Sequence, residues 1–115
     1  MAEWTKVIQE PNGVDMTYIQ QGDVLLFEEN IPTDLVSENT NIVQHGKATG
    51  HSHRLPESET VYVHPKTKER YLKLVKPAIL KHEEHNPIEI PPGTYRIGIV
   101  KEYDHFLEES RNVAD

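Results

Sequence analysis

The chain has 115 residues, about the length of one domain, and it carries 19 acidic against 12 basic side chains for a formal charge of -7. This acidic balance, with an aromatic content of only 7%, argues against a protein that binds duplex DNA by neutralising its phosphates. The absence of cysteine excludes disulfides, thiolate ligands and thiol nucleophiles, so any metal ion would have to be bound by histidine and carboxylate side chains.

The N-terminal part of the chain predicts short strands. Two segments, residues 4–9 and 14–20, flank Glu10-Pro11-Asn12-Gly13, and Asn-Gly is a strong signal for a two-residue hairpin turn. We therefore expect an N-terminal hairpin within residues 1–20. Residues 23–27 follow with four consecutive apolar side chains, which is typical of a strand buried on both faces.

The middle of the chain predicts a loop and two further strands. Residues 28–41 are rich in turn-forming residues and predict a connection with one strand fragment around Leu35-Val36. Residues 41–45 and 51–55 predict short strands. The loop between them, Gly46 to Gly50, contains two glycines that permit close backbone approach to another group.

The rest of the chain continues the pattern of short, alternating segments separated by proline, glycine and asparagine. Strands are predicted at residues 61–64, 70–76, 78–82, 88–90 and 94–100. Residues 101–115 predict a short helix and tail, with Asp104 as the N-cap of a helix over His105 to Arg111. We predict a single all-β domain over residues 1–115, a small barrel or two-sheet sandwich of about seven to nine strands with a short C-terminal helix.

No stretch approaches the roughly 18 to 20 apolar residues that a membrane span requires. The first six residues, MAEWTK, contain an acidic residue and no apolar run of the kind found in signal peptides. We therefore expect a cytoplasmic protein that does not act at a membrane. Because a small β domain has free sheet edges that readily pair, a homodimer is a further expectation.

Four of the seven histidines lie in two polar clusters, and these carry the main functional signal. His51 and His53 are two residues apart on a predicted strand, so both rings point to the same face. His82-Glu83-Glu84-His85 forms the second cluster, at the turn after another predicted strand. Imidazole offers one ring nitrogen to a metal while an acceptor orients the other. We predict His51, His53 and His82 as ligands of a divalent metal ion such as Zn.

Several roles follow for the acidic residues and for the fourth histidine. In an enzymatic version the metal would lower the pKa of a bound water, with Glu84 or Glu83 as general base, and would promote hydrolysis of a phosphoester or nucleotide. His85 would then be catalytic, because four histidine ligands leave little open coordination. In a metal-free alternative, paired histidines act as general acid and base on a nucleotide. The plainest alternative is that all four are exposed turn histidines.

Two other residues are candidates for contact with a small-molecule ligand. His45 lies at the other mouth of the glycine loop and would complete the cluster. Arg54 follows the histidine pair with the opposite strand parity and would matter if a phosphate binds nearby. The isolated His64 and His105 are expected to be surface or internally satisfied residues.

Basic residues gather in a different part of the chain. Six of the 12 cationic side chains lie within the sixteen positions from Lys66 to Lys81. The simpler interpretation is a solvated outer face of a hairpin. The functional alternative is a non-enzymatic binding protein that captures another protein or a small nucleotide with Lys66, Lys68 and Arg70.

The segment His51-x-His53-x-x-x-Glu57 resembles the first half of the cupin metal motif, which implies two histidines and a glutamate on one divalent ion inside a small β-barrel. The chain departs from that motif in its glycines, since Gly46 lies five rather than six residues before His51. In addition, no third histidine follows Pro92-Gly93 at the cupin spacing.

A second resemblance covers most of the chain from Gln21 onward. It is carried by the segments GDVLL (22–26), ATGHSH (48–53), HEEHNPI (82–88), PPGTY (91–95) and EYD (102–104). Together these segments resemble a family of small uncharacterised proteins encoded by bacteria and their phages. The resemblance implies a stand-alone cytoplasmic protein in a phage setting and no particular activity. In that setting the non-enzymatic alternative is a phage-type binding protein that captures a host protein or a small nucleotide. The N-terminal hairpin lies outside it and would be an addition specific to this protein.

Overall fold

The computed structural model describes residues 6–9, 15–46 and 50–100, with the backbone alone for residues 6–9 and 15–17. Within these ranges the chain is all-β, as predicted, and contains eleven strands. The strands are β1 (Lys6–Gln9), β2 (Asp15–Gln21), β3 (Val24–Glu28), β4 (Val36–Ser37), β5 (Ile42–His45), β6 (Ser52–Arg54), β7 (Val61–Val63), β8 (Arg70–Leu74), β9 (Ala78–Leu80), β10 (Ile88–Ile90) and β11 (Gly93–Ile99). This exceeds the expected seven to nine, because segments as short as two residues pair with a neighbour.

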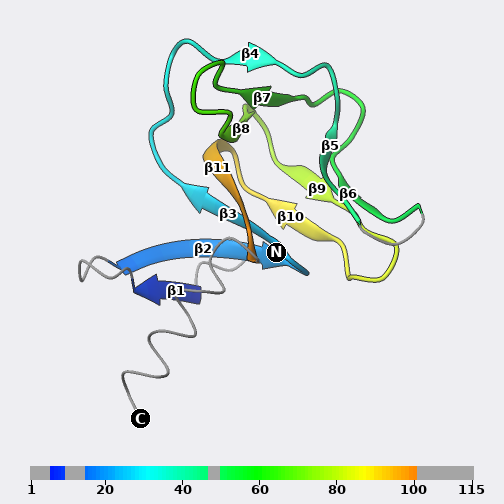
Figure 1. Ribbon diagram of the computed structural model, residues 1–115. Coiled ribbons are helices and arrows are strands. Elements are labelled where there is room, and N and C mark those ends of the chain that lie inside the picture. The colour runs from blue at the N-terminus through cyan, green and yellow to red at the C-terminus, as the bar shows by residue number, and fades with distance from the viewer. Residues whose placement is uncertain (1–5, 10–14, 47–49, 101–115) are drawn as a thin grey trace.

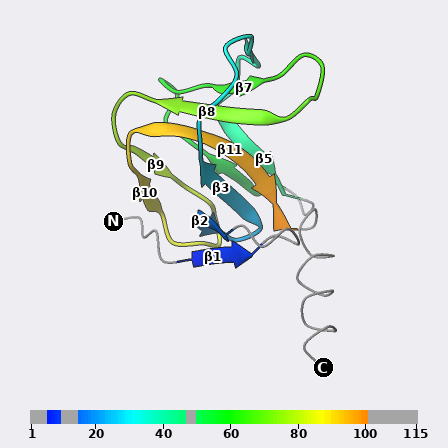
Figure 2. The same cartoon turned by 90° about the vertical axis from the view of Figure 1, so that its left-hand side faces the viewer.

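Seven of these strands form one antiparallel sheet in the order β1-β2-β3-β11-β8-β7-β4 (Figure 1). The pairs β5-β6 and β9-β10 form two smaller antiparallel sheets. A β-bridge between Arg54 and Lys81 joins these two pairs edge to edge. The sheets do not close into a barrel. Of the two predicted architectures, the sandwich therefore fits, with the small sheets as its second layer (Figure 2).

The main core lies between the two layers. The large sheet contributes Ile19, Val24, Leu26, Val61, Leu72, Leu74, Tyr95 and Ile97, and the second layer contributes Val43, Leu55, Ala78, Leu80 and Ile90. The strand predicted at residues 94–100 corresponds to β11, whose Tyr95 and Ile97 belong to this core and whose Ile99 packs against it. Burial raises the pKa of Tyr95 to about 12, and its hydroxyl donates to the Pro91 carbonyl oxygen at 2.6 Å.

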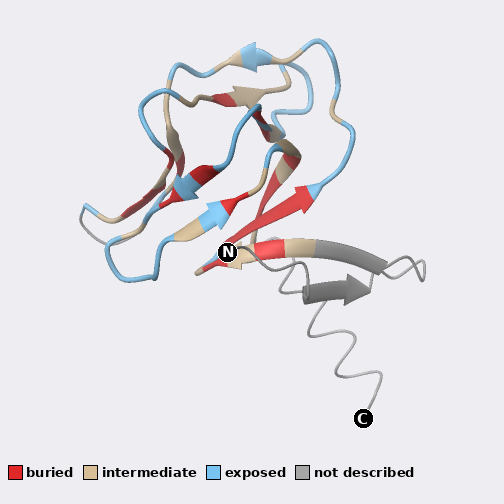
Figure 3. Ribbon diagram, turned by 180° about the vertical axis from the view of Figure 1, so that it is seen from behind, coloured by how far each residue is buried: buried red, intermediate tan, exposed pale blue. Residues whose placement is uncertain are grey.

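Strand β3 is buried on both faces, as its run of apolar residues predicted (Figure 3). Val24 and Leu26 belong to the main core. Leu25 and Phe27 point to the opposite face of the sheet, where they form a second apolar cluster. A strand with both faces covered is fixed in register, so the turn that precedes it is held in place as well.

The bridge between the two small sheets places their polar ends side by side. The backbone N–H of Arg54 donates to the carbonyl oxygen of Lys81 at 2.9 Å. In return, the N–H of Lys81 donates to the carbonyl oxygen of Arg54, also at 2.9 Å. The residues next to these two positions are His53 and His82. The pairing of two strands therefore brings together histidines that are far apart in the sequence.

The predictions for the two ends of the chain have different outcomes. The N-terminal hairpin is present, with β1 and β2 antiparallel from Lys6 opposite Tyr18 to Gln9 opposite Asp15. Its turn at residues 10–14 lies outside the described residues. So do the predicted helix over 104–111 and the rest of 101–115. In the part of the chain that is described, no helix is long and apolar enough to cross a membrane.

The core predicts a strong effect of shortening Leu72, whose side chain is fully buried. We expect Leu72→Ala to lower the free energy of unfolding by about 2 to 5 kcal/mol, because lost burial and an unfilled cavity both add to the cost. Val75, which is 94% exposed, is the matched control, and Val75→Ala should change stability by less than about 0.5 kcal/mol. Urea denaturation measures both values, and equal midpoints for the two variants would contradict this core assignment.

Candidate functional site

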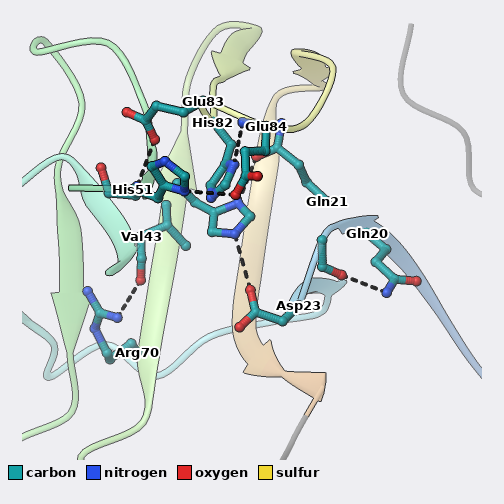
Figure 4. A network of polar contacts seen from close by, with 12 residues as sticks. Gln20, Gln21, Asp23, Val43, His51, Arg70, His82, Glu83 and Glu84 are labelled. Atoms are coloured by element: carbon teal, nitrogen blue, oxygen red, sulfur yellow. Dashed lines mark hydrogen bonds and ion pairs between the residues drawn. The ribbon is translucent and has the colours of Figure 1, made fainter. Parts of the chain in front are cut away.

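Four histidines from two parts of the chain meet in one pocket of about 440 Å³. His51 and His53 come from the start of β6, and His82 and His85 from the turn after β9. The ring of His82 lies between the others, with centroid separations of 4.3 Å to His53, 4.7 Å to His85 and 5.7 Å to His51. The other described residues that line the pocket are Gly22, Asp23, Gly46 and Glu84. The two clusters that the sequence singled out thus form one site (Figure 4).

Gln21 fixes the proton of His53, which is only 2% exposed. The side-chain NH₂ of Gln21 donates to the carbonyl oxygens of Leu80 and Asn86, each at 2.9 Å. Carbonyls can only accept, so the Gln21 amide oxygen must be the atom that faces Nδ1 of His53 at 2.8 Å. That oxygen also only accepts, so Nδ1 of His53 carries the proton. In the neutral ring, Nε2 therefore presents a lone pair.

The lone pair of His53 faces a carboxylate. Nε2 of His53 lies 3.1 Å from Oδ1 of Asp23. Burial and the charge of His82 lower the pKa of His53 below its ordinary value of 6.5, although Asp23 opposes this shift. In the neutral ring, whose proton lies on Nδ1, Nε2 and Oδ1 are two acceptor atoms that face one another, whereas in the protonated ring Nε2–H donates to Asp23. A cation placed between them would be stabilised by both.

Glu84 organises the other two rings that face it (Figure 4). Its carboxylate lies 2.8 Å from Nδ1 of His51, so His51 donates there and keeps its Nε2 lone pair in the neutral ring. The backbone N–H of Glu84 donates to Nδ1 of His82 at 3.0 Å. Neutral His82 therefore carries its proton on Nε2, opposite to His51 and His53.

Glu83 belongs to a structural clamp beside the pocket. Its carboxylate accepts from the backbone N–H of Ser52 at 2.9 Å and pairs with the Arg54 guanidinium at 2.7 Å. These contacts, the Ser52 N–H first, lower the pKa of Glu83 to about 2. Glu83 is thus a poor general base near neutral pH, and of these two adjacent glutamates Glu84 is the one that lines the pocket.

Gly22 makes room for two of the rings. A Cβ added there would lie 2.6 Å from Nε2 of His85 and 3.1 Å from Cε1 of His53. Gly22 also has a positive φ of +57°, which side chains rarely adopt. The backbone conformation of this turn therefore favours glycine, and a side chain here would also force the exposed ring of His85 to move.

Three residues that the sequence singled out as possible ligands, His45, Arg54 and Glu57, lie apart from the pocket. His45 is exposed on β5, opposite Ser52, and is not among the lining residues. Arg54 lines a separate pocket of about 270 Å³ together with Glu57. The histidine pair and Glu57 thus do not share one pocket, and the cupin arrangement is not confirmed. His64 is internally satisfied, because its Nδ1 accepts from the backbone N–H groups of Lys66 and Thr67.

Sequence reasoning missed Gln21, Gly22 and Asp23 as residues of the site. They form a polar turn ahead of a core strand. The sequence of such a turn predicts a chain reversal and gives no indication of a binding site. The segment GDVLL did include two of them, but only as part of a resemblance. Which loop the turn would face depends on how the two layers stack.

The ligand types suit a metal ion, while the side-chain positions do not yet converge on one point. In the described ranges, no group of three or more His, Asp or Glu side chains is placed so as to hold a metal ion. The hydrogen bonds to Glu84 account for part of this, since they direct the rings of His51 and His82. A bound ion would require some rings to rotate.

Comparison with known proteins gave one match. The model of a family described as a domain of unknown function (DUF8820) matches residues 20–99. This range contains the whole of the histidine pocket and leaves out β1 and most of β2. No curated protein and no solved structure matches the chain.

The ring protons predict a specific NMR pattern for the metal-free protein. In long-range ¹H–¹⁵N spectra near pH 8, His51 and His53 should be protonated at Nδ1 and His82 at Nε2, because of the partners described above. Gln21→Met should release His53 from this tautomer and leave that of His82 unchanged. An Nε2–H signal for His53 in the wild type would contradict the assignment.

The pairing with Asp23 predicts a shift in the titration of His53. Since Asp23 raises a pKa that burial lowers, Asp23→Asn should lower the pKa of His53 further. A buried base with a lowered pKa binds its proton more readily in the unfolded state, so stability should fall as pH drops below about 6.5, and more steeply in the variant. NMR titration of the metal-free protein measures the pKa, and Asp34→Asn, beside His64, is the control that should leave His53 unchanged.

Proposed function

We propose that this chain, which belongs to the family described as a domain of unknown function (DUF8820), uses its histidine pocket to bind a divalent metal ion such as Zn²⁺. The observation that carries the proposal is the hydrogen bond from His53 to Gln21. A metal-binding histidine typically donates its second ring N–H to an acceptor, which fixes the ring and leaves the other nitrogen available. His53 has this arrangement in a buried position.

Asp23 supplies the second ligand in this proposal. Two ligand atoms at about 2.0 to 2.2 Å from one tetrahedral zinc ion lie about 3.4 Å apart. Nε2 of His53 and Oδ1 of Asp23 are 3.1 Å apart, so a small widening accommodates an ion. Asp23 was absent from the set predicted from sequence, and we add it here.

His85 and His51 are the further ligands. Two imidazoles on one zinc ion have ring centroids about 5 Å apart, and His85 lies 5.9 Å from His53 by this measure. His85 is exposed, and a rotation of its ring would direct a nitrogen at the ion. In the neutral ring of His51, Nε2 presents a lone pair, while Nδ1 donates to the Glu84 carboxylate with an N···O distance of 2.8 Å. The predicted role of His82 as a ligand changes, because its Nε2 carries a proton while Glu84 binds Nδ1.

The chemistry available to such a site is hydrolytic. A bound ion would supply Lewis acidity and a lowered pKa of bound water. Glu84 is the carboxylate suited to accept a proton, because it lines the pocket and its side chain is 67% exposed. Hydrolysis of a phosphoester or nucleotide stays part of the proposal, with His82, as a proton donor, in the catalytic role that the sequence predicted for His85.

The alternative function, capture of an anionic partner by the segment from Lys66 to Lys81, has weaker geometric support. Arg70 is occupied within the chain, since its guanidinium donates to Glu38 and to the carbonyl oxygens of Ile42 and Val43. The Lys73 ammonium lies 4.2 Å from the centroid of the Tyr62 ring. Two of the six cations of that segment therefore have contacts within the chain.

Metal content tests the proposal directly. Untagged protein should take up about one equivalent of Zn²⁺ or Co²⁺, and His53→Ala and Asp23→Asn should each weaken binding at least tenfold, because each removes one of the two preformed ligands. His45→Ala, an exposed histidine outside the pocket, is the matched control and should bind as the wild type does. Elemental analysis after dialysis and competition with a chromogenic chelator give stoichiometry and affinity. Equal binding by His53→Ala and the wild type would contradict the proposal.

A further inference from the structure

His82 differs from the other pocket histidines in the position of its proton. Its Nδ1 accepts from the backbone N–H of Glu84 at 3.0 Å. A backbone N–H group can only donate, so Nδ1 must be the acceptor in this hydrogen bond. The neutral ring must therefore carry its hydrogen on Nε2. As a metal ligand through Nε2, His82 would have to lose this hydrogen bond.

The ring of His82 lies directly beside the proposed metal ligands. It is half-buried, it lines the same pocket, and its centroid is 4.3 Å from that of His53 and 4.7 Å from that of His85. The backbone of Glu84 fixes its orientation. The pocket thus combines a pair of ligand atoms, His53 Nε2 and Asp23 Oδ1, with a hydrogen-bond donor next to them.

The charge and the size of the pocket indicate which kind of ligand would accept a hydrogen bond from Nε2 of His82. Among the lining residues that the structure describes, Asp23 and Glu84 are the carboxylates, and none is a lysine or an arginine. A divalent ion would balance their two negative charges and remove the repulsion that an anion would otherwise meet. The pocket volume of about 440 Å³ is far larger than the roughly 30 Å³ that a water molecule occupies in the liquid.

We propose that the metal-loaded pocket binds an oxyanion with two or more acceptor oxygens, as in phosphate or a carboxylate. One oxygen contacts the ion and a second accepts the hydrogen bond from Nε2 of His82. This inference rests on the proposed metal site and names its ligand class. His82 is then a substrate-contacting donor and not a metal ligand.

The test uses Co²⁺-loaded full-length protein titrated with inorganic phosphate and, separately, with acetate. Calorimetry and the visible spectrum of the bound ion report binding. His82→Leu removes the donor, and His82→Gln keeps an N–H group at a similar reach. We expect both variants to bind Co²⁺ within about threefold of the wild type, while phosphate affinity falls about tenfold in His82→Leu alone, since hydrogen bonds to charged groups contribute about 1.5 kcal/mol or more.

The outcomes separate this inference from the proposed function. Loss of Co²⁺ binding in His82→Leu would make His82 a ligand and overturn the inference while the metal site stands. Unchanged phosphate affinity in a metal-binding variant would overturn it as well. Absence of Co²⁺ binding by the wild type would contradict both the proposed metal site and this inference. If acetate affinity falls in His82→Leu as phosphate affinity does, the result would support the oxyanion class and would include carboxylates among its members.

Discussion

The side-chain amide of Gln21 is the contact on which the arrangement of the pocket depends. Buried at the end of β2, it donates to Leu80 at the end of β9 and to Asn86 in the turn that follows, and it accepts from His53 on β6. Three elements are thus joined by one group whose donors and acceptor are all used. Because an unpaired buried polar group is costly, this group also fixes the tautomer of the histidine it holds.

A second set of contacts holds the turn after β9 against β6. The Glu83 carboxylate bridges the Ser52 N–H and the Arg54 side chain, while the neighbouring Glu84 directs the rings of His51 and His82. Adjacent carboxylates therefore have different tasks, one in the clamp and one in the pocket. The polar neighbours of the histidines set which nitrogen of each ring is available, and this matters more for the chemistry of the pocket than the number of histidines.

Much of the fold could be predicted from local patterns. The continuous apolar run of β3 predicted its burial on both faces, because side chains on a strand alternate strictly between two sides, and the alternating segment at residues 94–100 predicted the strand β11. The choice between barrel and sandwich could not be predicted in this way. It depends on which strands become neighbours, as when β11 inserts between β3 and β8, and such pairing arises from contacts across the whole chain.

The sequence by itself determined the all-β class, the absence of thiol chemistry, and the two histidine clusters as the centre of interest. The tertiary structure alone decided that His53 and His82 are neighbours, that Asp23 faces them, and that His45 does not. The physical reason is one of range. Strand periodicity and turn propensity act over a few residues, whereas the pocket is formed by a strand pairing and by buried hydrogen bonds between segments up to 65 positions apart.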